Sequence, residues 1–154
     1  SMTTQLKQSI EQLYEEDYVL WLDETLKQLQ RQEIESLDWT HLIEEIEALG
    51  NEQRNKVDSY LRQLLIHLLL YAYWTQERER CGEGWKDEID NFRYELELLF
   101  SSKTLYNYFL QRIDVVYPKA RKKAISKTQL PTTVFPEQCP YSPDELLNSD
   151  YFPS

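Results

Sequence analysis

Residues 57–74 are the segment that most constrains how this chain can fold. Apolar residues recur there at helical spacing, and from Leu64 onward they occupy every side of the expected helix. A helix that is apolar all round must be surrounded by other helices. Its uninterrupted apolar run, residues 68–74, is much shorter than the roughly 20 residues that a membrane span needs. The sequence therefore predicts that this segment is the central helix of a bundle.

The overall composition agrees with a helical domain. The chain has 154 residues, of which 41% are hydrophobic, 29% are charged and only three are glycine. These proportions are typical of a single globular domain, and the low glycine content favours long helices. We expect an all-α bundle of about four to five helices over residues 10–128. A flexible segment at residues 1–9 should precede it, and an extended tail at residues 129–154 should follow it.

The segments before the central helix also have helical patterns. Residues 10–34 repeat apolar positions at helical spacing, and Asp38 is suited to cap the helix that follows them. Gly50 and Asn51 could end that second helix through a left-handed residue. The apolar phase nevertheless resumes at Val57 with little slip. Two separate helices and one kinked continuous helix both remain open.

Three features mark the boundaries after the central helix. Residues 81–84 are the clearest predicted loop, because two glycines flank Glu83. Residues 85–100 then form an apolar seam typical of antiparallel bundle packing. Ser101 or Ser102 can cap the next helix, at about residues 104–126, and Pro118 should bend or break it.

The composition changes after Leu130. Five prolines are interspersed with four aromatic residues: Phe135, Tyr141, Tyr151 and Phe152. Disordered tails carry few aromatic residues, so we expect an extended segment whose rings hold it against the bundle. The sequence from Ser142 to Glu145 fits a capping box with proline at the first helical position. It predicts one short helix in the tail.

The net charge of −10 is unevenly distributed. Residues 11–58 contain fourteen Asp and Glu against four Lys and Arg, whereas the rest of the chain is balanced. This acidic front argues against general nucleic-acid binding, which depends on neutralising phosphates. A basic cluster without acids consists of Lys119, Arg121, Lys122, Lys123 and Lys127. It is interpreted as a solvated helix end, as a surface for an acidic partner or the acidic front of another copy, or as a site of weak nucleic-acid contact.

Four ionisable residues fall on or beside apolar stripes: Asp17, Glu45, His67 and Arg93. Burying any of them alone would cost several kcal/mol. We therefore predict an internal polar network that pairs these two acids with these two bases. The functional alternative is a small site between helices in which His67 acts as acid or base and a carboxylate orients it.

A metal site is a more specific version of that alternative. His41 and Glu45 stand four residues apart and share a helix face, and His67 could supply a third ligand. Three protein ligands and a water form the pattern of catalytic zinc, which would make the protein a metal-assisted hydrolase.

Established catalytic signatures are absent from the sequence. It contains no glycine-rich phosphate loop, nucleophile elbow, Walker sequence or HExxH. Cys81 and Cys139 lack CxxC spacing and are expected to be free thiols in a reducing cytoplasm. We expect no cofactor.

Three motifs, in order, carry a resemblance to a known family. They are Asp38-Trp39-x-x-Leu42-x-Glu44-Glu45-Ile46-Glu47-x-Leu49-Gly50, Leu64-Leu65-x-His67-Leu68-Leu69 and Phe135-Pro136-x-x-Cys139-Pro140-Tyr141. With them the chain resembles the bacterial, largely cyanobacterial family known as domain of unknown function 29. The family commonly has a basic residue where this chain has Leu70. The resemblance implies a small, helical, cytoplasmic bacterial protein and brings no established activity or catalytic residues.

Function is predicted from these observations together. The uneven charge, the missing catalytic motifs and the aromatic tail indicate a non-enzymatic helical module that binds a protein partner or itself. No basic–apolar–small signal opens the chain, so we expect it in the cytoplasm, without membrane attachment.

Overall fold

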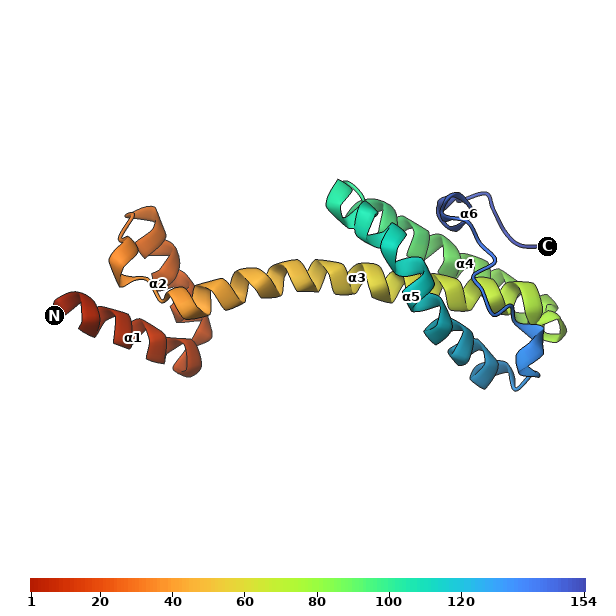
Figure 1. Cartoon of the computed structure of the whole chain (residues 1–154), viewed down its shortest axis with the longest axis horizontal. Helices are drawn as coiled ribbons and strands as arrows, with labels where there is room; N and C mark the ends of the chain where they lie inside the picture. The colour runs from red at the N-terminus through yellow and green to blue at the C-terminus, as the bar shows by residue number, and fades with distance from the viewer. The chain divides into compact units, whose positions relative to one another are not determined.

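The structure, a computed structural model, describes residues 1–154, and all of its regular secondary structure is helical (Figure 1). It has six α-helices and two short 3-10 helices. They are α1 (Met2–Glu16), α2 (Tyr18–Gln30), η1 (Ile34–Ser36), α3 (Trp39–Tyr73), α4 (Thr75–Leu99), α5 (Lys103–Thr128), η2 (Thr132–Val134) and α6 (Pro143–Leu147). The predicted all-α fold is confirmed.

The chain divides into two compact units. The N-terminal unit is Ser1–Asn51 and the C-terminal unit is Glu52–Ser154, and α3 belongs to both. The physical reason is the placement of the apolar residues. The hydrophobic core consists of residues from Val57 onward, whereas the N-terminal unit fully buries only Trp21 and Leu37 among its large apolar side chains.

Asp17 separates the first two helices of the N-terminal unit. Its backbone leaves the helical region, with φ −151° and ψ 87°. Its N–H donates to the carbonyl oxygen of Leu13 at 2.8 Å, and its carboxylate accepts from the N–H of Leu20 at 3.1 Å. One residue thus ends α1 and caps α2. The sequence predicted one helix over residues 10–34 because the apolar spacing continues across the break, and residues 1–9, predicted to be flexible, belong to α1.

The helix α3 settles the alternative left open at Gly50 and Asn51. It runs without interruption for 35 residues, so the continuous helix is correct. Asp38 caps its start as predicted, because its carboxylate accepts from the N–H of His41 at 3.3 Å.

The second half of α3 is the centre of the C-terminal unit. Leu61, Leu64 and Leu68 are fully buried there, against Ile89 of α4 and Phe109 of α5. The helix is apolar all round because helices surround it, as its sequence predicts. None of the helices combines the length and the apolarity that a membrane crossing requires.

The predicted loop at residues 81–84 is wrong, because these residues lie inside α4. Gly82 is buried, and a Cβ atom there would lie 3.3 Å from Cγ of Arg78 and 3.7 Å from Cε2 of Tyr71. This glycine therefore serves close packing against the Tyr71 ring of α3 rather than a turn. The chain instead turns at Trp74, between α3 and α4, where φ is −90° and ψ is 63°.

The predictions for the last third of the chain mostly hold. Ser102 caps α5, which then continues through Pro118 instead of breaking there. In the tail, Ser142 and Glu145 form the predicted capping box at the start of α6. Phe135 and Tyr141 are buried in the core, so aromatic rings do hold the tail against the bundle.

Candidate functional site

The N-terminal unit contains a cluster of hydrogen-bonded aromatic and ionisable side chains. We call it the tyrosine–histidine cluster. Its members are Tyr14 of α1, Tyr18 and Trp21 of α2, Asp38, and His41 and Glu45 of α3.

Glu45 is held by two phenol groups. The hydroxyl of Tyr14 donates to Oε1 of Glu45 at 2.5 Å, and the hydroxyl of Tyr18 donates to Oε2 at 2.5 Å. These two hydrogen bonds lower the pKa of Glu45. The same bond to the Glu45 carboxylate, assisted by desolvation, raises the pKa of Tyr14 to about 12. Both oxygens of Glu45 are therefore already occupied by groups of the protein itself.

Asp38 holds His41 in one orientation. Its fully buried carboxylate accepts from Nε1 of Trp21 at 3.1 Å and contacts Nδ1 of His41 at 2.5 Å. The imidazole stacks on the ring of Tyr14, with centroids 3.8 Å apart and planes 7° from parallel. Desolvation lowers the pKa of His41, but the hydrogen bond to Asp38 and the surrounding carboxylate charge outweigh it, and the pKa of His41 is raised.

The contacts of His41 can be compared with those of a catalytic histidine. A carboxylate on Nδ1 that leaves Nε2 free is the arrangement used by histidine general bases. Here the hydrogen bond to Asp38 and the nearby carboxylates raise the pKa of His41. The hydrogen bond of the His41 ring joins its Nδ1 to Asp38, and neither a hydroxyl nor a thiol group is hydrogen-bonded to the ring. What the contacts do is join α1, α2 and α3.

The four predicted network residues have separate partners. In the N-terminal unit, Asp17 caps α2 and Glu45 accepts from two tyrosines. In the C-terminal unit, Nδ1 of His67 donates to the carbonyl oxygen of Gln63 at 2.7 Å, and burial lowers the pKa of His67. The proposed pairing of acids with bases is not what the structure shows. The sequence predicts Asp17 beside the apolar stripe of one helix over residues 10–34, but α1 ends at Glu16.

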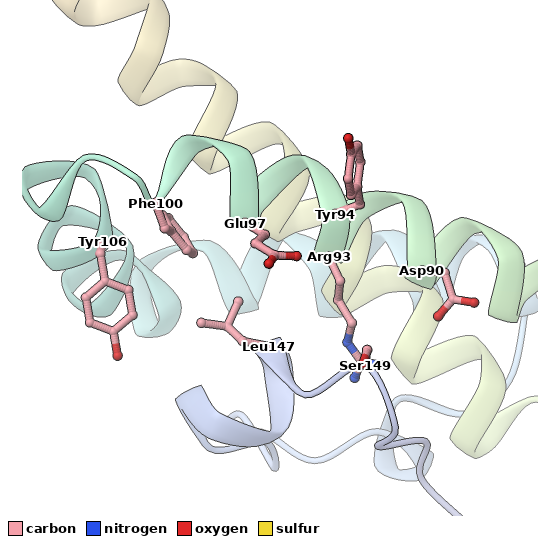
Figure 2. A pocket seen from close by; sticks show the side chains of 8 residues that line it. All are labelled: Asp90, Arg93, Tyr94, Glu97, Phe100, Tyr106, Leu147 and Ser149. Atoms are coloured by element: carbon pink, nitrogen blue, oxygen red, sulfur yellow. The ribbon is translucent and has the colours of Figure 1, made fainter.

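Arg93 is almost fully buried and has no carboxylate partner. Its Nε donates to the carbonyl oxygen of Leu146 at 2.8 Å and its Nη2 to that of Glu145 at 3.0 Å. Figure 2 shows its side chain extending from α4 toward the tail, along the wall of a groove. The groove is lined by Asp90, Arg93, Tyr94, Glu97, Phe100, Tyr106, Leu147 and Ser149. Arg93 therefore binds the carbonyl end of α6 and fastens the tail to the bundle.

The proposed metal ligands do not converge. His41 has its Nδ1 on Asp38, Glu45 has both oxygens on phenols, and His67 lies in the other unit with its Nδ1 on a backbone carbonyl. No group of three or more His, Cys, Asp or Glu side chains in the chain could hold an ion together. Cys81 and Cys139 are free thiols.

The basic cluster divides into one structural residue and four exposed ones. Arg121 donates to the carbonyl oxygens of Thr132 at 2.8 Å and Phe135 at 3.2 Å, and so helps to hold the tail. The other members are exposed and have no ion-pair partner in the chain: Lys119, Lys122, Lys123 and Lys127.

Sequence reasoning missed Tyr14, Tyr18 and Asp38 as members of a polar cluster. Tyr14 and Tyr18 are among the positions of the helical pattern over residues 10–34, and the sequence predicts Asp38 only as a cap. Asp38 and His41 stand three residues apart, a spacing at which helical side chains meet, so this pair could have been found.

The fold and the cluster define a class, namely an all-α protein with a small acidic N-terminal unit and a larger helical C-terminal unit. The sequence pattern of the family described as Domain of unknown function DUF29 matches residues 13–152, and the chain belongs to that family. Neither a curated protein nor a solved structure matches the chain.

Proposed function

We propose that this protein is a helical interaction module, which acts by binding another protein or a second copy of itself through its N-terminal unit. One observation carries the proposal. Thirteen of the seventeen large apolar side chains that are exposed to solvent lie in the N-terminal unit, although it is only a third of the chain. Apolar surface gathered in this way is typical of binding surfaces.

The exposed residues of α2 form a regular stripe. Val19, Leu22, Leu26 and Leu29 follow one another at spacings of three, four and three residues, and all are exposed. Residues at these spacings share one side of a helix. Trp21, Thr25 and Gln28 face the interior of the unit from another side of α2. The stripe thus has the pattern of a helix that packs against a further helix, and the N-terminal unit does not supply one.

The occupied donors and acceptors of the tyrosine–histidine cluster support binding rather than catalysis. The carboxylate oxygens of Glu45 and Asp38 already form hydrogen bonds with side chains of the same unit. The cluster would then serve to fix α2 and the start of α3 relative to each other, so that their exposed stripes form a defined surface.

Matched variants test the proposal. Leu26 is 54% exposed and Ile46 is 61% exposed, so the double variant Leu26→Gln/Ile46→Gln should fold normally. The control is Leu98→Gln/Val115→Gln in the C-terminal unit, where the exposures are 54% and 49%. Light scattering over a range of concentrations measures self-association. Affinity capture from source-cell extract, followed by chromatography of the captured complex, measures binding to a partner.

We expect the wild type and the control to form a complex of defined stoichiometry and the N-terminal variant to lose it. A protein that is strictly monomeric and captures nothing at physiological concentration contradicts the proposal. So does a complex that the two double variants weaken equally.

A further inference from the structure

The first three turns of α3 have an apolar stripe that the N-terminal unit leaves uncovered. Trp39, Ile43, Ile46 and Leu49 are all exposed, with Ile46 and Leu49 above 60%. Their spacings of four, three and three residues place them along one side of the helix. His41 and Glu45 occupy a different side, which faces Tyr14.

Over the length of this stripe the charged residues of the chain are acidic, and the first basic residues beyond it on α3 are Arg54 and Lys56. Residues 32–51 contain six Asp and Glu and no Lys or Arg. Two of the six, Glu44 and Glu47, are exposed on the same turns as Ile43 and Ile46. The N-terminal unit as a whole has twelve acidic residues against Lys7, Lys27 and Arg31, a net charge of −9. The surface is therefore apolar along the stripe and acidic along one border, at Glu44 and Glu47.

This charge indicates what does not cover the stripe. A symmetric pairing of two copies through α3 would bring a net charge of −9 against another of −9, and the repulsion opposes association. The exposed lysines of α5 could meet the acidic border in a head-to-tail arrangement. They lie among residues 119–127, where no large apolar side chain is exposed to fill the stripe, and such a contact would build an open chain rather than a closed oligomer.

We propose that this stripe binds an amphipathic helix of a different protein, whose apolar face is bordered by Lys and Arg. The proposal rests on the proposed function and names the partner's chemistry. A stripe spaced by three and four residues accepts the side chains of another helix between its own. At 1.5 Å per residue the stripe is about 16 Å long, which matches about three turns of a partner helix. Basic flanks on that helix supply the charge complementarity that raises the association rate and excludes acidic competitors.

Synthetic helical peptides of about 18 residues, or five turns, are the probes. The first has a leucine stripe bordered by Lys and Arg, the second has the same stripe bordered by Glu, and the third keeps the basic residues but replaces the leucines with serine. Fluorescence anisotropy measures their binding to the full chain. The exposed Trp39 lies in the stripe, so its emission should shift to the blue when a peptide covers it.

We expect the first peptide to bind at least about tenfold tighter than the other two, which corresponds to 1.4 kcal/mol. Its affinity should fall with salt, because the charges that attract it are exposed. Ile46→Gln should weaken binding about tenfold, Glu44→Lys/Glu47→Lys should reverse the preference between the first two peptides, and Val115→Gln should change nothing.

Three results overturn the inference. Equal affinity for the basic and the acidic peptide removes the charge argument, and binding that Ile46→Gln leaves unchanged removes the stripe. A stable dimer that Ile46→Gln dissolves identifies a second copy as the occupant. In that last case the proposed function stands while this inference falls, whereas both fall when Leu26→Gln/Ile46→Gln alters neither assembly nor capture.

Discussion

Glu45 is the residue at which the three helices of the N-terminal unit meet. Its carboxylate accepts one hydrogen bond from α1, through Tyr14, and one from α2, through Tyr18. A phenol that donates to a carboxylate gives up its proton less readily, because the phenolate would face a negative charge. The pKa of Tyr14 is therefore a direct report on this contact.

Replacing Glu45 with glutamine should return that pKa toward its ordinary value. The amide has no charge, so the pKa of Tyr14 should fall from about 12 toward 10. Absorbance titration of the tyrosines at alkaline pH measures the change. Glu47→Gln, on an exposed side of the same helix, is the control and should leave the titration as in the wild type. A Tyr14 pKa that stays near 12 in Glu45→Gln would contradict the contact.

The two histidines should affect stability with opposite signs. The pKa of His41 is raised above 6.5, so its contribution to stability is fully present below that value and is lost as pH rises through the raised pKa. The pKa of His67 is lowered, so its contribution is present above 6.5 and is lost as pH falls toward the lowered pKa.

Urea unfolding of His41→Gln and His67→Gln at about pH 5.5 and about pH 8 measures these contributions. His41→Gln should cost more stability at the lower pH, and His67→Gln should cost more at the higher pH. NMR titration of the two imidazole rings provides the pKa values independently. The same pH dependence in both variants would show that one of the two environments is wrong.

Single residues also show where sequence reasoning succeeds. Asp38 and Ser142 could be predicted as helix caps because a cap depends on a side chain and a backbone N–H two or three residues away. Arg93 could be placed near the core, but its partners could not be named. They are backbone carbonyls 52 and 53 residues further along the chain. Every residue has a backbone carbonyl, so the sequence does not indicate which of them accepts a hydrogen bond.

Among the helices, α4 offers a matched pair of glycines. Gly84 has nothing within 4 Å of an added Cβ, so Gly84→Ala should stabilise the protein by about 1 kcal/mol, the ordinary preference of a helix interior for alanine. Gly82→Ala should gain less, because its Cβ would lie 3.3 Å from Arg78 and force that side chain to move. Urea unfolding compares the two variants. Equal gains would mean that the approach of Tyr71 and Arg78 to Gly82 does not constrain the helix.

The attachment of α6 to α4 depends on Arg93. Arg93→Met keeps the apolar stem and leaves the carbonyl oxygens of Glu145 and Leu146 without their donor, which should cost about 2 kcal/mol. Hydrogen exchange should become faster in the tail before it changes in α4. Arg80→Met is the control, because Arg80 lies on the same helix but is 79% exposed. An unchanged tail in Arg93→Met would contradict the role of Arg93 as its fastening.

At the scale of elements, the sequence predicts the number and type of helices better than their ends. Two missed boundaries have different causes, namely close packing at Gly82 and a capping side chain at Asp17. Two glycines within residues 81–84 normally indicate a loop, but here Gly82 is needed where α4 passes close to Tyr71. The apolar spacing across Asp17 normally indicates a continuous helix, but here one capping residue divides it.

For the whole molecule, the two units should differ in stability. The N-terminal unit has a net charge of −9 and fully buries only two large apolar side chains, whereas the C-terminal unit has fifteen acidic and fourteen basic residues around an extensive core. A small core and self-repulsion both favour local opening. Composition averages over these two units, so their difference could not be predicted from totals.

Hydrogen exchange measured by mass spectrometry should show this difference. Backbone amides of α1 and α2 should exchange faster than those in residues 57–73. Adding about 0.5 M salt, which shortens the screening length to about 4 Å, should slow exchange in the N-terminal unit and leave the C-terminal unit unchanged. Uniform protection across the chain, insensitive to salt, would contradict the difference.

The single residue between α1 and α2 makes chain length itself a structural parameter. Asp17 is both the C-cap of α1 and the N-cap of α2. No loop separates the two helices, so an added or deleted residue cannot be accommodated between them. In a helix each residue turns the chain by about 100°. An insertion between Tyr14 and Asp17 would rotate the phenol of Tyr14 by about 100° relative to that of Tyr18, and Glu45 could no longer reach both. Insertions that a surface loop would tolerate should therefore disassemble the N-terminal unit here.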